Sequence, residues 1–229
     1  MRLSHLMLAI AFMLSLIAPA YGQDGDVRRR ARLYEPVIAE AARKYGVDPH
    51  LLWTIGYLES GFRSGLVSPK GARGLMQFMD GTAVRYGLMD PYNPKESIAA
   101  AARYLRDLQG RFGGRGDLIL AAYNAGEGAV EAFRDGKRLV TRDGRVINLD
   151  GVRTGGIPPY METRGYVTRG RIIYQDLIRE GVFPIRQQRV FEDKVDKASV
   201  TRPGMQEPLS VYASEPGQGT EDINTIYAN

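Results

Sequence analysis

The chain has 229 residues, 44% of them apolar, and a formal net charge of +5, which fits one globular domain with extensions and favours an anionic partner. It contains no cysteine, which excludes a disulfide framework, a thiol nucleophile and a lipid attached to an N-terminal cysteine. Its two histidines, His5 and a lone His50 that we expect at the surface of a helix start, are too few for a zinc site or a Ser-His-Asp triad.

The first predicted element is an apolar segment at the N-terminus. Arg2 is followed by an apolar run over residues 6–17 and then by the small residues 18–20. This is the order of a secretory signal peptide, and the run is shorter than the roughly 20 residues that span a bilayer. We therefore expect residues 1–22 to be a cleaved signal peptide rather than a membrane anchor, and residues 23–31 to be a linker.

Helical periodicity runs from about residue 32 to residue 183. A first helix is expected to end at Gly46, because glycine tolerates the left-handed conformation of a C-cap. Asp48 is a good N-cap and Pro49 suits a first helical position, so a second helix follows at once and ends at Gly61. The apolar stripes of these two helices are Tyr34, Val37, Ile38, Ala41 and Tyr45, then Leu51, Leu52, Ile55 and Leu58.

Three further helices are expected downstream. Asn93 and Glu96 have the spacing of a capping box that opens a long core helix. Another helix begins near Asp117, and a last one ends before Gly181. The long core helix is expected to bury Ile98, Ala101, Ala102, Leu105 and Leu108.

Two regions depart from the helical pattern. Within residues 133–156, the stretch 139–147 contains an Asp-Gly pair between apolar residues, which predicts a short β-hairpin in a surface excursion. Residues 184–229 lack clustered apolar residues and contain seven acidic and five basic groups. Such a segment cannot offset the entropy of ordering, so we expect a flexible, disordered tail.

Glu59 is the candidate for acid–base chemistry. It lies at the last turn of the second predicted helix, on the stripe shared by Leu52 and Ile55. Apolar surroundings and the negative end of the helix dipole both raise the pKa of a carboxyl group there. A neutral carboxylic acid is what a glycosidase needs to protonate a leaving sugar oxygen. On this feature alone, an outward-turned glutamate at a frayed helix end is the simpler interpretation.

A run of motifs behind Glu59 changes that interpretation. In order, spacing and residue type, these motifs closely resemble the catalytic domain of the soluble lytic transglycosylases, which are related to goose-type lysozyme. The resemblance covers about residues 34–178. The motifs are Glu59-Ser60-Gly61-Phe62, Ser68-Pro69-Lys70-Gly71-Ala72-Arg73-Gly74-Leu75-Met76-Gln77, Ala122-Tyr123-Asn124-Ala125-Gly126, Ile157-Pro158-Pro159-Tyr160 and Glu162-Thr163-Arg164-Gly165-Tyr166-Val167.

The resemblance implies a mainly α, lysozyme-like helical domain over residues 32–183 with a glycan-binding cleft. It also implies that Glu59 is the single catalytic acid and base. Ser68 and Gln77 can form hydrogen bonds with sugar groups, and the ring of Tyr123 can lie near the acid. Gly74 and Gly126 can let the backbone approach the substrate closely. The substrate-binding residues implied are Ser68, Gln77, Met79, Tyr123, Asn124 and Glu162, although core packing, a turn or a helix start would also explain several of them.

The implied reaction is non-hydrolytic cleavage of peptidoglycan between N-acetylmuramic acid (MurNAc) and N-acetylglucosamine (GlcNAc), leaving a 1,6-anhydro end. No cofactor or metal is expected. With the predicted signal peptide, we expect an exported monomer of the periplasm, the cell-wall space or the extracellular space. Its expected partner is the peptidoglycan strand, and cell-wall or secretion-machinery proteins are further candidates. Nucleic-acid binding would explain the charge, but no readout motif supports it. Two alternatives stay open: a hydrolytic muramidase in which Glu162, Asp80 or Glu127 helps to hold water, and a non-catalytic wall-binding component of a secretion apparatus.

The chain departs from the family pattern at Asp80 and Glu127, which stand where relatives often have proline, and at Ala101, which replaces a frequent glycine. None of these positions is the catalytic acid. The excursion over residues 133–156 is longer than usual. We expect it to alter one wall of the cleft and with it the substrate preference.

Overall fold

The computed structural model describes residues 25–141 and 144–183, and this part of the chain is mostly helical, as expected. The predicted signal peptide, the predicted tail and the tip of the hairpin at 142–143 lie outside the described residues. The elements are α2 Glu35–Tyr45, α3 Pro49–Ser60, α4 Asp80–Arg85, α5 Pro94–Phe112, α6 Gly116–Ala125, α7 Glu127–Asp135, β1 Leu139–Val140, β2 Val146–Ile147 and α8 Met161–Glu180.

Caps fix the ends of α2 and α3 where the sequence predicts them. Gly46 closes α2 in the left-handed region, with φ 68° and ψ 37°. The Asp48 carboxylate accepts the His50 backbone N–H, Pro49 occupies the first turn, and Gly61 closes α3 at φ 57°. Both helix ends are therefore set locally, and Glu59 lies one residue before the end of α3.

The N-terminus of α5 is capped somewhat differently from a capping box. The Asn93 side chain accepts the backbone N–H groups of Lys95 and Glu96, as an N-cap does. The Glu96 carboxylate accepts hydrogen bonds from the Asn93 side chain and from the backbone of Asp90 instead of the Asn93 backbone. All five apolar residues expected in the stripe of α5 are buried.

Two short helices and an N-terminal segment were not predicted. Residues 25–32 are helical where we expected a linker, and Ala31 is completely buried in the core. Helix α4 has only six residues and no side-chain cap. Helix α7 follows α6 after a break at Gly126, whose φ of 84° and ψ of 145° interrupt the helical pattern. A helix as short as α4 has too little periodicity to be recognised in a sequence. Helix α7 instead has buried apolar residues at helical spacing, so a signal for it was present in the sequence.

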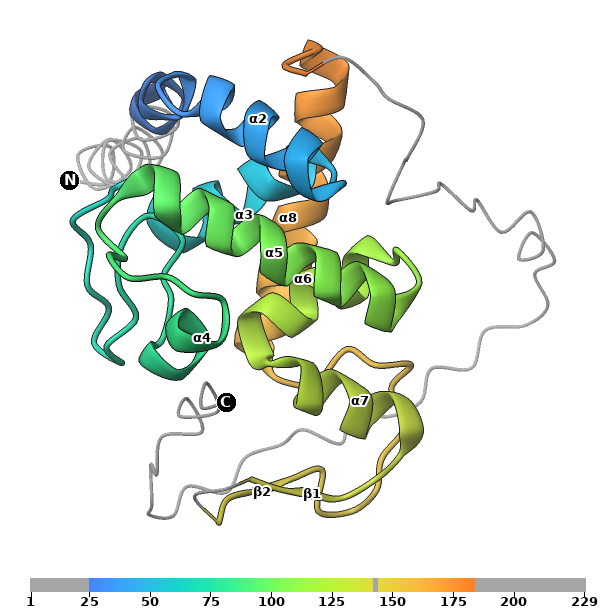
Figure 1. The fold of residues 1–229 in the computed structure, drawn as a ribbon. Coiled ribbons are helices and arrows are strands. Elements are labelled where there is room, and N and C mark those ends of the chain that lie inside the picture. Colours follow the sequence, from blue (N-terminus) through green and yellow to red (C-terminus); the bar gives the residue numbers. More distant parts are fainter. Residues whose placement is uncertain (1–24, 142–143, 184–229) are drawn as a thin grey trace, which may run out of the picture.

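Helix α3 lies at the centre of the molecule. It packs against α2, α5 and α8, and α8 packs also against α6. In Figure 1, α5 runs across the front, α8 stands behind it, and the hairpin lies at the far end beyond α7. The seven residues from His50 to Gly56 in α3 are all buried, Trp53 among them. The part of α3 that precedes its last turn is therefore firmly packed. Within the described ranges, no helix is long and apolar enough to cross a membrane.

His50 is not the surface residue that we expected. It is 5% exposed, and its Nδ1 lies 3.0 Å from Oδ1 of Asp48. The hydroxyl of Tyr174 donates to the other oxygen of Asp48 at 2.5 Å. The N-cap of α3 is therefore also a buried link to α8, which a local capping argument does not predict.

A second, smaller hydrophobic cluster joins α7 to the hairpin. Strand β1 pairs antiparallel with β2 in the register Leu139↔Ile147 and Val140↔Val146, which confirms the predicted hairpin. Ile147 is 4% exposed and packs among residues from α6 and α7. The excursion is therefore attached to the body and is not merely a surface loop. The buried members of the cluster are Ala125, Ala129, Ala132, Phe133 and Ile147.

Candidate active site

A cavity of about 420 Å³ opens beside the last turn of α3. One wall is the loop over residues 68–79 with the start of α4, and the other comprises the α6–α7 junction, the hairpin and the start of α8. The structure brings all seven residues singled out in the sequence to this cavity. They are Glu59, Ser68, Gln77, Met79, Tyr123, Asn124 and Glu162.

Glu59 is held at the end of α3 by a tyrosine from α8. The Tyr166 hydroxyl donates to Glu59 Oε1 at 2.7 Å. Burial raises the pKa of Glu59 to about 8; the Tyr166 hydrogen bond opposes this shift, and the nearby charge of Glu162 adds to it. The direction agrees with the prediction from the apolar stripe. At neutral pH Glu59 is therefore mostly a neutral acid that can give up a proton.

The loop that contains Ser68 and Gln77 is ordered by its own hydrogen bonds. The Ser68 hydroxyl oxygen accepts the Ala72 backbone N–H at 2.9 Å. The Gln77 backbone has a φ of 50°, which is uncommon for a residue with a side chain. Its amide nitrogen donates to the carbonyls of Leu66 at 3.2 Å and Gly74 at 2.7 Å. Because these bonds use both amide hydrogens, Gln77 has only its side-chain oxygen left for a ligand.

Gly74 has a packing role and not the expected role of substrate approach. A Cβ at this position would lie 1.8 Å from the carbonyl oxygen of Pro91, and the backbone φ is 79°. The loop therefore needs glycine to pack against its neighbour. Gly126 does line the cavity, and a Cβ added there would have no heavy atom of another segment within 4 Å. That backbone can be approached closely from the cavity.

Tyr123 and Asn124 come from the end of α6. The Tyr123 hydroxyl donates to the Met76 carbonyl at 3.0 Å, and its ring lies 5.2 Å from that of Tyr104. The Asn124 side-chain oxygen accepts from the Thr163 hydroxyl at 2.8 Å. Both residues thus tie α6 to a neighbouring segment while lining the cavity. The groups left for a ligand are the phenolic oxygen of Tyr123 and the amide nitrogen of Asn124.

Glu162 and Met79 lie on opposite walls. Glu162, in the first turn of α8, is exposed and forms an ion pair with Lys70 of the loop at 3.5 Å. Met79 is the N-cap residue of α4 and lines the cavity with a thioether side chain. The Lys70–Glu162 pair joins the two walls at the rim.

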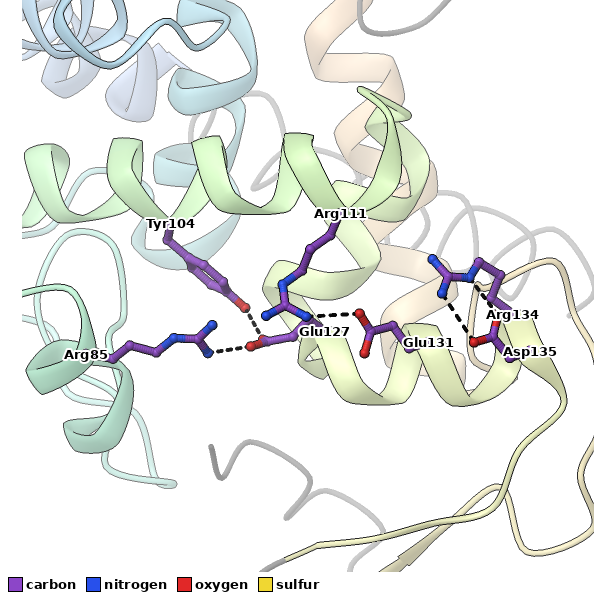
Figure 2. Close-up of polar contacts among 7 residues, drawn as sticks. All are labelled: Arg85, Tyr104, Arg111, Glu127, Glu131, Arg134 and Asp135. Carbon is purple, nitrogen blue, oxygen red and sulfur yellow. Dashed lines mark hydrogen bonds and ion pairs between the residues drawn. The ribbon is translucent and has the colours of Figure 1, made fainter.

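Glu127 is a lining residue that the sequence indicates only weakly. Its carboxylate forms an ion pair with Arg85 of α4 and accepts from the Tyr104 hydroxyl of α5 at 3.0 Å. Figure 2 shows these contacts at one end of a row of ion pairs along α7, which continues through Arg111–Glu131. Burial by itself raises the pKa of Glu127, but the hydrogen bonds and the charge of Arg85 outweigh it, so the pKa is lowered. Glu127 is therefore charged at neutral pH.

Sequence reasoning also missed Tyr166 as a site residue. It belongs to the apolar stripe of α8 and is 4% exposed, so its periodicity is that of a core residue. Its place in the last motif, four residues after Glu162, was the available signal. In the part of the chain described here, no three His, Cys, Asp or Glu side chains are arranged to hold a metal ion.

Comparison with known proteins identifies relatives of this domain. Residues 36–139 match the family described as the transglycosylase SLT domain. The membrane-bound lytic murein transglycosylase F 1 of Alkalilimnicola ehrlichii is 32% identical over 203 residues, which are 83% of this chain and 38% of that protein. The membrane-bound lytic murein transglycosylase F of Marinobacter nauticus is 37% identical over 125 residues, which are 52% of this chain and 24% of that protein.

A solved structure agrees with these relatives. The 70 kDa soluble lytic transglycosylase of Escherichia coli aligns with 64% of this chain and 24% of its own, at 27% identity and a TM-score of 0.50. The resemblance drawn from the motifs and the lysozyme-like fold expected from it are thereby confirmed. This chain spans less than half the length of each of these relatives.

Proposed function

Since this chain belongs to the family of transglycosylase SLT domains, we propose that it is a peptidoglycan lytic transglycosylase that cleaves the β-1,4 bond between MurNAc and GlcNAc. The observation that carries the proposal is Glu59, a carboxyl group with a pKa of about 8 that lies within the matched residues and lines the cavity. Such a group is mostly protonated at neutral pH and can deliver its proton to a glycosidic oxygen.

Glu59 would act in both halves of the reaction. It first protonates the oxygen between the two sugars, and the bond from that oxygen to C1 of MurNAc breaks. The resulting carboxylate then takes the proton of the MurNAc C6 hydroxyl, whose oxygen bonds to C1. The products are a 1,6-anhydro end and a GlcNAc hydroxyl, and no water is consumed. Because the nucleophile belongs to the bound sugar, its attack is intramolecular and entropically favoured. Tyr166 stabilises the transient carboxylate through its hydrogen bond.

The remaining lining residues would hold the strand. Gln77 has an acceptor oxygen for hydroxyl or N-acetyl N–H groups, and Asn124 has a donor nitrogen for carbonyl oxygens. Aromatic and thioether side chains give apolar contact to sugar faces. In this proposal the substrate-binding set is Ser68, Gln77, Met79, Tyr123, Asn124 and Glu162.

Hydrolysis is supported less well than transglycosylation. A hydrolytic enzyme needs a second carboxylate as a nucleophile or to activate water. Each carboxylate that is a candidate for that role forms an ion pair with a lysine or arginine. The cation competes with a sugar carbon or a water molecule for the carboxylate oxygens. The pairs are Asp80 with Arg73, Glu127 with Arg85, and Glu162 with Lys70. A purely wall-binding role is disfavoured by Glu59, because a binder has no use for a carboxyl group held neutral.

We further propose that the protein is exported and acts as a monomer in the periplasm or cell-wall space. The apolar segment over residues 6–17 and the small residues after it support export. The relatives' names place murein transglycosylases at a membrane. Recovery of the mature protein with its N-terminus intact in a membrane fraction would contradict cleavage of the signal peptide.

Product analysis tests the reaction. Purified protein is incubated with isolated peptidoglycan, and the soluble fragments are identified by mass spectrometry. A 1,6-anhydro end and a reducing end differ by one water, so the two reactions give separable masses. We expect 1,6-anhydro ends. Fragments with reducing MurNAc ends would show that the reaction is hydrolysis. Absence of fragments would favour a binding role.

A further inference from the structure

A second pocket, of about 560 Å³, lies between α8 and the segment over residues 154–157. Three residues of α8 line the catalytic cavity, and each is followed two positions later by a residue that lines this pocket. Two positions correspond to a rotation of about 200° on a helix, so the pocket lies on the opposite face of α8. The cavity residues are Glu162, Tyr166 and Arg169, and the pocket residues that follow them are Arg164, Thr168 and Arg171.

The pocket combines cationic and aliphatic side chains. Arg164 and Arg171 are seven positions apart, which places them two turns, or about 10 Å, apart along α8. Between and beside them lie Val167, which is 5% exposed, and Ile172, which is 55% exposed. Guanidinium groups bind carboxylates well, and aliphatic side chains bind apolar groups. The pocket therefore suits a peptide that has acidic and aliphatic residues close together.

Both arginines of the pocket are available to a ligand. Neither Arg164 nor Arg171 forms an ion pair or a side-chain hydrogen bond with any residue of the two described ranges. On the same helix, by contrast, Arg179 pairs with Asp176. The guanidinium groups of Arg164 and Arg171 can therefore bind an anion that comes from outside the described ranges.

One segment of the chain itself has the complementary composition. Residues 203–229, which we call the acidic segment, contain four acidic groups and no lysine or arginine. Two of these groups, Glu221 and Asp222, directly precede Ile223. All five basic groups of residues 184–229 lie in the part before this segment, residues 184–202. The acidic segment therefore offers the carboxylates and aliphatic groups that the pocket suits.

The acidic segment is connected closely enough to reach the pocket. Helix α8 has 20 residues and is therefore about 30 Å long. The 19 residues between Phe183 and the acidic segment can span at most about 65 Å. This is enough to return along the whole of α8. Because the segment belongs to the same chain, its effective concentration at the pocket is high, so even a weak site can be occupied.

We propose that the pocket on the outer face of α8 is a docking site for the acidic segment. Carboxylates of the segment pair with Arg164 and Arg171, and its aliphatic side chains contact Val167 and Ile172. The site lies outside the catalytic cavity and does not depend on the proposed function. An anionic glycan would also be attracted to the arginines, but it has no aliphatic side chains for the apolar part of the pocket.

Paramagnetic NMR on the full chain tests the docking. The chain has no cysteine, so Thr220→Cys provides a single site for a nitroxide label next to Glu221. The label broadens the amide signals of nearby residues. We expect the strongest broadening at residues 154–157 and 164–175. Added salt should weaken the broadening, because exposed ion pairs are screened.

Removing both pocket cations should release the segment. In Arg164→Gln with Arg171→Gln, we expect the bound fraction to fall about fivefold, as for the loss of two exposed ion pairs. Glutamine is a good helix former, so α8 should persist. The matched control is Arg43→Gln with Arg106→Gln, which makes the same change in charge at two exposed positions of α2 and α5. The control should keep the wild-type broadening.

A variant of the segment itself makes the test independent of any effect on α8. Glu221→Gln with Asp222→Asn leaves residues 25–183 unchanged and should lower the broadening as the pocket variant does. Equal broadening over the whole surface, or no broadening at the pocket, would overturn the proposal. So would a control that loses as much broadening as the pocket variant, since the attraction would then be general. Broadening that disappears on dilution would assign the pocket to the segment of a second copy instead.

Discussion

Glu59 and Glu127 line the same cavity, but their pKa values are shifted in opposite directions. Glu59 accepts a hydrogen bond from Tyr166, and burial raises its pKa to about 8. Burial acts on Glu127 in the same sense, yet the pKa of Glu127 is lowered, because Arg85 forms an ion pair with it and Tyr104 donates a hydrogen bond. One carboxyl group is thus neutral near pH 7, and the other is charged.

Burial alone therefore does not make a carboxyl group a proton donor. What separates the two groups is a cation, since Arg85 favours the charged form of Glu127 by direct Coulomb attraction. Glu59 forms no ion pair with a lysine or arginine anywhere in residues 25–141 or 144–183. A hydroxyl donor such as Tyr166 can orient the carboxyl group without fully stabilising its charge.

The largest effect is expected from Glu59→Gln. Glutamine keeps the shape of the side chain and can still form hydrogen bonds, but it can neither deliver nor accept a proton. Acid–base assistance contributes about 10²–10⁴-fold to rate, and we expect the loss to reach the upper end because one residue serves both steps. Release of 1,6-anhydro fragments measures the effect, and glycan binding should persist. Turnover close to wild type would refute the assigned role.

The same variant should be more stable than the wild type at alkaline pH. The folded protein holds the Glu59 proton up to about pH 8, whereas an unfolded glutamate loses it near 4.5. The folded state therefore binds more protons in this interval, and its stability falls as pH rises through it. The free energy of unfolding of Glu59→Gln lacks this dependence on pH. At pH 8 we therefore expect it to exceed that of the wild type by about 1–3 kcal/mol. Urea unfolding of both proteins at pH 5 and pH 8 measures the difference, and equal slopes would contradict the raised pKa.

A smaller effect is expected from Tyr166→Phe. The hydrogen bond from Tyr166 lowers the pKa of Glu59. Because this variant removes the bond, the pKa of Glu59 should rise further. Loss of one such bond costs about 1.5 kcal/mol, or about tenfold in rate. Because the proton donor must be protonated, the alkaline limb of the pH–rate profile should move to higher pH. If the rate falls but the alkaline limb of the pH–rate profile stays at the same pH, Tyr166 only packs against Glu59 and does not set its pKa.

Removing the cation from Glu127 should make this carboxyl group more like Glu59. In Arg85→Gln, burial is no longer offset by the ion pair, and the pKa of Glu127 should rise. The Arg85 side chain is 42% exposed, so the expected cost in stability is only about 0–1 kcal/mol. A pH titration of the variant by NMR measures the pKa. An unchanged value would show that Tyr104 and the start of α7 suffice to keep Glu127 charged.

The smallest effect on cleavage is expected from Glu127→Gln. If Glu127 takes no part in proton transfer, the rate should stay within about threefold of the wild type, far from the 10²–10⁴-fold of an acid–base group. The assay is again the release of fragments from peptidoglycan. A loss comparable to that of Glu59→Gln would show that a second carboxylate is needed and would favour hydrolysis.

Local signals in the sequence predicted much of this fold. The ends of α2, α3 and α8 follow from Gly46, Asp48, Gly61 and Gly181, whose effects act within one turn of a helix. Seven of the residues that line the cavity followed from the resemblance to the family. In both cases the information is contained in short stretches of sequence.

The features that escaped prediction depend on contacts between distant residues. The bond from Tyr166 to Glu59 spans 107 positions, and the Arg85–Glu127 contact spans 42. His50 has the spacing of a surface residue and is buried because α8 covers it. Periodicity reports which face of an element is apolar, not which partner covers it. The pairing that separates Glu127 from Glu59 therefore required the structure.

The most direct test is a pH titration of the glutamate carboxyl groups by carbon-13 NMR, with Glu59→Gln and Glu127→Gln to assign the two signals. Glu59 is expected to titrate near pH 8 and Glu127 below the ordinary value of 4.5. This result would establish Glu59 as the neutral acid of the cavity. Titration of Glu59 at or below the value for Glu127 would contradict the account, because a carboxylate already charged at neutral pH has no proton to give.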